Sequence, residues 1–158
     1  MELGSWLISK RGKLFRPGRI INNAPWIFHL DDHQMLKMGM WEGIIKPFFP
    51  GARYTTVDDG DEAFKELENC YQNFNVPDVI FTDILHPGLD GRKFVLAIRR
   101  LEKRLNWPKP VPIIIFSFVS NEFPELENVE RLQRFNKCDG INDLAEAIEY
   151  ALYGEGFR

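Results

Sequence analysis

Short apolar runs alternate with amphipathic stretches along most of this chain. The runs hold few polar residues and many strand-forming side chains, so they predict buried strands; they span 26–30, 53–57, 79–81, 111–116 and, more weakly, 131–136. The stretches between them carry apolar residues three and four apart, which predicts helices; these span 33–46, 61–74, 92–105 and 142–153. Region 121–130 is acidic and weakly periodic, so a short or irregular helix is expected there. The pattern predicts an α/β architecture, a parallel sheet between two layers of helices.

The first predicted helix has a broad apolar face, which includes Met35, Met38 and Trp41. Pro47 is expected to end this helix, because proline lacks a backbone N–H and clashes with the preceding turn. The fifth helix is expected to begin at Asn142 or Asp143, either of which can act as its N-cap.

The two ends of the chain fall outside this pattern. Residues 1–25 lack a sustained period and contain several glycines and prolines, so they are expected to form an N-terminal arm. Trp6, Leu14 and Phe15 make the arm too apolar for a purely solvated tail, and docking on its own domain is the favoured interpretation. The main domain is expected to span 26–154, and residues 155–158 a short C-terminal tail.

Composition limits the class of protein. The chain has 158 residues, of which 44% are hydrophobic, which suits one domain with a proper core. No run reaches the roughly 18 apolar residues of a membrane span, so no membrane partner is expected. Lys10, Arg11 and Lys13 follow the apolar N-terminal residues instead of preceding them, which argues against a signal peptide. The two cysteines, Cys70 and Cys138, have no metal-binding spacing, and a reduced cytoplasmic protein is expected.

Charge is spread unevenly along the chain. The net charge is −3, but residues 1–25 hold one acid and five bases, so the remainder is strongly acidic. The helix at 92–105 combines an apolar face with basic residues predicted on its outer side: Arg92, Arg99, Arg100, Lys103 and Arg104. A basic stripe can bind nucleic acid, but a solvated helix face is the favoured interpretation, so no direct nucleic-acid contact is expected.

Polar residues follow four of the predicted strands. Asp31-Asp32 follows the first, Asp83 the third, Ser117 ends the fourth and Lys137 follows the fifth. In an open parallel sheet the carboxyl ends of neighbouring strands form the ligand site, so these side chains are expected to converge. Each also has a structural interpretation: a helix cap or loop carboxylate for the aspartates, a strand-end hydroxyl and a solvated amine.

The expected cluster has the chemistry of phosphoryl transfer. Three carboxylates a few ångströms apart repel one another and favour a bound cation. Mg²⁺ is suited to oxygen ligands and accepts phosphate oxygens. Lys137 offers a positive charge and Ser117 a hydroxyl for a phosphoryl group on Asp83, and such reactions depend mainly on positioning and charge neutralisation.

These motifs together resemble the receiver domain of two-component response regulators. The resemblance rests on Leu30-Asp31-Asp32-His33, on 83–91 with its Pro87-Gly88 and Asp90-Gly91 turns, on Phe116-Ser117 and on Lys137. It covers about residues 26–154 and is greatest to NarL-type receivers, and no C-terminal output domain is expected. It implies a flavodoxin-like, doubly wound five-stranded parallel sheet in the order 2-1-3-4-5, with five helices.

The resemblance also implies a role for each site residue. Asp83 is expected to be the phosphoacceptor, with Lys137 pairing with the phosphoryl group and Ser117 moving toward it. Asp32 is expected to bind Mg²⁺ directly and Asp31 mainly through water, with Asp83 and the backbone carbonyl of Leu85 as further ligands.

The implied partners are a sensor histidine kinase or phosphotransfer protein as phosphoryl donor and a downstream protein target. Homodimer formation is left open. The chain is not expected to be an enzyme beyond catalysing its own phosphorylation and dephosphorylation.

Several residues depart from the family pattern. His86 stands where methionine is common and Phe118 where alanine is common, and the usual Gly-Ala before the fifth strand is missing. Arg134 occupies the place of the switch aromatic, and Phe135 follows one residue later. One step along a strand reverses the face, so the usual coupling between hydroxyl and aromatic is in question.

Two other functions are compatible with parts of this pattern. A pseudo-receiver would use the same fold as a phosphorylation-independent interaction module, and the altered region 118–136 keeps that alternative open. A haloacid-dehalogenase-type phosphatase is disfavoured, because it needs Asp-x-Asp after the first strand, whereas His33 follows Asp31-Asp32 here.

Overall fold

A five-stranded parallel sheet forms the centre of the molecule. The computed structural model describes residues 7–8, 14–15, 24–118, 123–138 and 141–153. The sheet consists of β3 (Trp26–Leu30), β4 (Arg53–Val57), β5 (Val79–Thr82), β6 (Ile113–Ser117) and β7 (Leu132–Asn136). The strands lie in the order β4-β3-β5-β6-β7, and every neighbouring pair is parallel. This is the predicted order 2-1-3-4-5, so the predicted fold class is confirmed.

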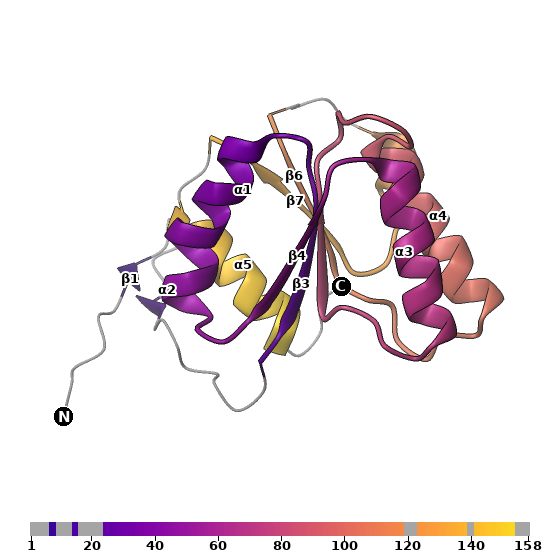
Figure 1. Cartoon of the computed structure of the whole chain (residues 1–158), viewed down its shortest axis with the longest axis horizontal. Coiled ribbons are helices and arrows are strands. Elements are labelled where there is room, and N and C mark those ends of the chain that lie inside the picture. The colour runs from indigo at the N-terminus through magenta and orange to yellow at the C-terminus, as the bar shows by residue number, and fades with distance from the viewer. Residues whose placement is uncertain (1–6, 9–13, 16–23, 119–122, 139–140, 154–158) are drawn as a thin grey trace.

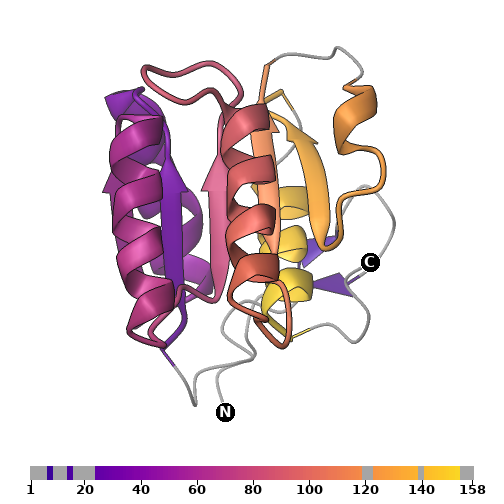
Figure 2. The same cartoon turned by 90° about the vertical axis from the view of Figure 1, so that its right-hand side faces the viewer.

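Helices cover both faces of the sheet (Figures 1 and 2). One face carries α5 (Ile141–Tyr153) and a first helical segment, which consists of α1 (Gln34–Met40), the π-helical turn η1 (Trp41–Ile45) and α2 (Lys46–Phe48). The other face carries α3 (Gly60–Gln72) and α4 (Gly91–Arg104). In the weakly periodic region the described residues form only a 3₁₀ turn, η2 (Pro124–Leu126). None of the described helices has the length and apolarity needed to cross a membrane.

Alternate residues of the inner strands supply two hydrophobic cores. Ile114 and Phe116 of β6 pack against the first helical segment and α5, while Ile113 and Ile115 face α3 and α4. β3, β5 and β6 are buried along their whole length. A strand that is covered on both faces is mostly apolar, which is why these segments appear in the sequence as nearly continuous apolar runs.

The first helical segment differs from the prediction in two ways. Met35 and Met38 are 81% and 61% exposed and Trp41 is also exposed, so the buried face is narrower than expected. The segment also continues past Pro47 to Phe48. The backbone N–H of Lys46 bonds to the carbonyl of Trp41, five residues earlier. We attribute the tolerance of Pro47 to this wider turn, which relieves the crowding between a proline ring and the preceding turn.

Arg99 also differs from its predicted place on the outer side of α4. Its side chain is only 13% exposed, and it donates to Glu102 Oε2 at 2.8 Å and to the backbone carbonyl of Val111 at 2.8 Å. Glu102 in turn accepts from Tyr71 Oη at 2.5 Å and from the backbone N–H of Val111 at 2.8 Å. This buried network, which we call the Glu102 cluster, joins α3 and α4 to the entrance of β6. A buried charge is stable only when it is paired in this way.

The predicted N-terminal arm contains a small sheet of its own. β1 (Leu7–Ile8) pairs with β2 (Leu14–Phe15) in antiparallel register. Figures 1 and 2 place this pair on the side of the main sheet that α5 covers. The rest of residues 1–23 and the tail 155–158 lie outside the described residues, so the predicted domain limits stay predictions.

Candidate functional site

The carboxyl ends of four strands bring Asp31, Asp83, Ser117 and Lys137 together. Lys137 Nζ donates to Asp31 Oδ2 at 2.8 Å and to Asp83 Oδ2 at 2.7 Å. The backbone N–H of Lys137 also bonds to the carbonyl of Ser117 at 3.1 Å. All four side chains are buried. The expected convergence is therefore seen for these four residues. The carboxyl ends of the strands form the upper edge of the sheet in Figure 2.

Asp31 is held as a carboxylate. Burial alone would raise the pKa of its carboxyl group, but the His29 ring, the Lys137 ammonium and the backbone N–H of His33 together lower that pKa well below its usual value. The His33 N–H donates to Asp31 Oδ1 at 2.8 Å. Asp83 Oδ1 accepts from the backbone N–H of Ile84 at 2.6 Å.

Asp32 lies further from the pocket than its neighbour. Its side chain is 37% exposed, and its Oδ1 is 3.3 Å from His33 Nδ1. The group whose ligand atoms all lie within 4.8 Å of one another consists of Asp31, His33 and Asp83. His33 was not among the predicted site residues, although its position next to Asp31-Asp32 was the available signal. The metal-binding roles of Asp31, Asp32, Asp83 and Leu85 stay predictions.

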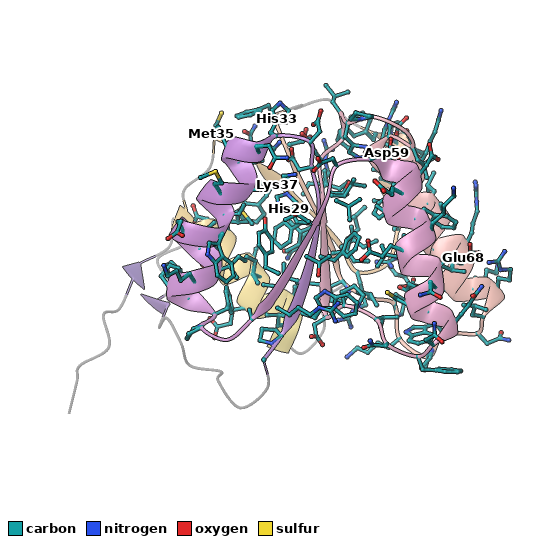
Figure 3. The ribbon with its side chains drawn as sticks, in the orientation of Figure 1. His29, His33, Met35, Lys37, Asp59 and Glu68 are labelled. Atoms are coloured by element: carbon teal, nitrogen blue, oxygen red, sulfur yellow. The ribbon has the colours of Figure 1, made fainter. Side chains whose placement is uncertain are left out.

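His29 is a buried polar residue that the sequence pattern assigned only to a strand. Its ring lies between α1 and the sheet (Figure 3) and is fully buried. Nδ1 is 2.5 Å from Tyr54 Oη, and Nε2 faces Asp31 Oδ2 at 3.7 Å, beyond hydrogen-bond length. Burial lowers the pKa of His29, which keeps the ring neutral near pH 7. No polar atom described in the structure hydrogen-bonds Nε2.

Two glycines allow the loop after Asp83 to pack closely against neighbouring atoms. Gly88 has a φ of +75°, a conformation that side chains disfavour, and a Cβ there would lie 2.6 Å from Asp59 Oδ1. A Cβ on Gly91 would lie 2.0 Å from the backbone oxygen of Asp83. Asp90 caps α4 by accepting from the N–H groups of Arg92 and Lys93. The predicted turn dipeptides therefore mark the points at which this loop folds back on Asp83.

Two exposed apolar side chains flank the pocket. Leu85 and Phe118 are each 64% exposed, and the ring centroid of Phe118 is 5.3 Å from Lys137 Nζ.

The residues of β7 follow the register that the sequence predicts. Phe135 lies opposite Phe116 and packs into the core beneath α5. Arg134 is exposed, and its guanidinium lies 4.9 Å from the centroid of the Phe123 ring. The position that the resemblance assigns to a switch aromatic therefore holds a cation, which stacks on the Phe123 ring.

Comparisons with known proteins identify the fold. No family model matches the chain, and no curated protein matches it. Solved structures of response-regulator receivers do match, at 21 to 24% identity in the examples that follow.

The phosphorylated cyanobacterial phytochrome response regulator RcpA is 22% identical and matches with a TM-score of 0.68, over 85% of this chain and 98% of its own. The receiver domain of the histidine kinase CKI1 from Arabidopsis thaliana, complexed with Mg²⁺ and BeF₃⁻, is 21% identical and matches with a TM-score of 0.62, over 80% and 89%. A LuxR-family DNA-binding response regulator from Staphylococcus aureus is 24% identical, with a TM-score of 0.63 over 81% and 98%. The chain has the fold of receiver domains over most of its length.

Gly91→Ala is expected to lower the free energy of unfolding by about 1–3 kcal/mol, because the added methyl group must push Asp83 and its loop away. Gly39→Ala is the matched control, since nothing lies within 4 Å of a Cβ at this helical position. It should raise stability by about 0.5–1 kcal/mol. Urea unfolding of both variants measures the contrast, and equal effects would contradict the close approach at Gly91.

Lys137→Met is expected to lower the free energy of unfolding by about 3 kcal/mol in metal-free buffer, because two buried carboxylates lose the ammonium that they share. The double variant Asp31→Asn/Lys137→Met should recover part of this loss, since it leaves one carboxylate instead of two. Chemical unfolding of the single and double variants tests the coupling. A double variant less stable than Lys137→Met would show that charge compensation is not what Lys137 contributes.

Proposed function

We propose that this chain is a phosphoacceptor receiver domain of two-component signal transduction, which takes a phosphoryl group onto Asp83. The observation that carries the proposal is the pair of buried carboxylates, Asp31 and Asp83, that share the Lys137 ammonium at the carboxyl end of the sheet. A receiver fold supports it, and among the similar structures one is phosphorylated and another is complexed with Mg²⁺ and BeF₃⁻.

In this proposal Asp83 is the nucleophile. The backbone N–H of Ile84 holds Oδ1, and Lys137 holds Oδ2. A carboxylate oxygen of Asp83 forms a bond to phosphorus as the bond from phosphorus to the donor's imidazole nitrogen breaks, and the electron pair leaves with that nitrogen. Lys137 neutralises charge on the transferred phosphoryl oxygens, and the Ser117 hydroxyl donates to one of them.

The donor set fits a divalent cation. The three carboxylates of Asp31, Asp32 and Asp83 with the one ammonium of Lys137 leave a formal charge of −2. Asp31, Asp32 and Asp83 would hold Mg²⁺ together with the carbonyl of Leu85, since carboxylate and carbonyl oxygens are the ligands this ion takes. When bound, Mg²⁺ supplies neutralisation of the phosphoryl oxygens.

The proposed partners are a sensor histidine kinase or phosphotransfer protein on the donor side and a protein target on the output side. The chain would act in the cytoplasm and would catalyse only its own phosphorylation and dephosphorylation. The receiver would span residues 26–154, with 1–25 as an arm and 155–158 as a tail.

The output surface is proposed to lie in region 118–136. Phe123 is approached by two guanidinium groups, those of Arg92 at 5.0 Å and Arg134 at 4.9 Å from its ring centroid. Phe135 already packs against the core. The response to phosphorylation would therefore involve region 118–136 without an inward movement of the Phe135 ring. The alternative is a pseudo-receiver, in which the same surface binds its partner whatever the state of Asp83.

Acetyl phosphate with Mg²⁺ is expected to add one phosphoryl group to the chain, and Asp83→Ala should abolish the addition because it removes the nucleophile. Asp58→Asn is the matched control, since Asp58 also follows a strand but is exposed and paired with Lys37. Intact mass spectrometry with and without Mg²⁺ gives the result. Survival of the adduct in Asp83→Ala would contradict the assignment.

Beryllofluoride bound at Asp83 is expected to change hydrogen-exchange protection in region 118–136 and little elsewhere, because the added group changes the contacts of Ser117 and Lys137 at the ends of β6 and β7. The two regions to compare are 118–136 and α3, which lies on another part of the sheet. Unchanged exchange in 118–136, with the analogue shown to be bound, would favour the pseudo-receiver.

A further inference from the structure

Two histidine rings flank the carboxylate of Asp31. His33 Nδ1 lies 3.0 Å from Oδ1, and His29 Nε2 faces Oδ2 at 3.7 Å. His33 is 62% exposed at the mouth of the pocket, whereas His29 is fully buried behind it (Figure 3). Neither ring has a place in the phosphoryl-transfer steps described above. A pocket built only of carboxylates, a lysine and a hydroxyl would not need them.

The His33 ring presents a nitrogen ligand to the pocket. A ring nitrogen of His33, with one carboxylate oxygen each from Asp31 and Asp83, forms a group whose atoms all lie within 4.8 Å of one another. Nδ1 also lies 3.3 Å from Asp32 Oδ1, so this edge of the ring faces two carboxylates. When Nδ1 binds a cation, the ring proton resides on Nε2, which can be hydrated because the side chain is exposed.

His29 is an independent sign that the pocket is arranged for a ligand. Tyr54 Oη has a proton to donate and Asp31 can only accept, so the His29 ring accepts at Nδ1 and carries its proton on Nε2. That buried Nε2–H points toward Asp31 and makes no hydrogen bond within the described structure. A buried donor of this kind is costly to leave unsatisfied. A small shift of the Asp31 carboxylate toward it would pair the two groups, as in sites where a histidine backs a metal-binding carboxylate.

We propose that this pocket is a mixed nitrogen and oxygen site that favours a divalent first-row transition ion, such as Ni²⁺, Co²⁺ or Zn²⁺, over Mg²⁺. His33, Asp31 and Asp83 supply the ligands, and His29 is a positioning residue for Asp31. Imidazole nitrogen suits these ions, whereas Mg²⁺ takes oxygen ligands and gains little from it. The inference rests on the proposed function, because it concerns which cation the same pocket takes.

The test compares Ni²⁺ and Mg²⁺ binding to the full chain by calorimetry. The chain carries Cys138→Ser so that this exposed thiol does not contribute. His33→Ala should weaken Ni²⁺ binding at least about tenfold, the size of effect that loss of a group at a metal site produces. It should leave Mg²⁺ binding almost unchanged.

His86→Ala is the matched control. His86 is also near the pocket, but its Nδ1 lies 3.2 Å from the backbone oxygen of Pro87 and it is outside the ligand group. This variant should alter neither affinity. The visible absorption of bound Co²⁺ gives a second readout, because loss of a nitrogen ligand should change its bands in His33→Ala and leave them unchanged in His86→Ala.

The positioning role of His29 is tested separately. His29→Leu should weaken binding of both ions, since Asp31 is a ligand for either. Because that change alters the core, Tyr54→Phe serves as a second variant, which removes only the hydroxyl that orients the ring. Full affinity in both variants would overturn the role of His29.

Acetyl-phosphate labelling of the same proteins separates the two hypotheses. If Asp83 is labelled in the presence of Mg²⁺ and Ni²⁺ affinity is the same in His33→Ala as in the parent chain, the metal inference alone is overturned. Absence of labelling, together with Ni²⁺ binding that depends on His33, overturns the proposed function alone. Equal loss of Ni²⁺ and Mg²⁺ affinity in His33→Ala would also count against selectivity, because it would mean that His33 only supports the pocket.

Discussion

One ammonium group ties together strands that are far apart in the chain. Lys137 bonds to Asp31 and Asp83, which precede it by 106 and 54 residues. It comes from the end of β7, at the edge of the sheet, and reaches across to β3. Both carboxylates are buried, and the nearby positive charge offsets part of the cost of burying them. The order of the strands and the charge balance of the pocket therefore depend on each other.

The sequence predicts most of this arrangement, because its strongest signals are local. A strand buried on both faces is mostly apolar, so β3, β5 and β6 could be recognised from the sequence. The polar residues that follow them then marked the site. The fold class and the convergence of Asp31, Asp83, Ser117 and Lys137 were predictable for that reason. The shift between Arg134 and Phe135 could also be predicted, since the two faces of a strand alternate.

The structure differs from the sequence-based prediction where contacts between residues far apart in the chain decide the position of a side chain. Met35 and Met38 are apolar at helical spacing, but nothing in the sequence tells which residues of the first helical segment face the sheet. From its spacing in the sequence Arg99 is predicted to be a surface cation. In the structure it donates to Glu102 and to the backbone carbonyl of Val111. His29 reads as one polar residue within an apolar run, and only the positions of Tyr54 and Asp31 reveal what it contacts.

The Glu102 cluster lies at the opposite end of the sheet from the acidic pocket, where it joins Tyr71 on α3 to Arg99 on α4 and to the backbone before β6. Arg99 also donates to the carbonyls of Glu130 and Arg131, just before β7. The amino ends of β6 and β7 are thus held by the Glu102 cluster, while Lys137 ties the carboxyl end of β7 to Asp31 and Asp83. A change of charge at Asp83 would therefore act on the carboxyl ends of these strands, because the opposite ends are held by a separate set of ion pairs and hydrogen bonds.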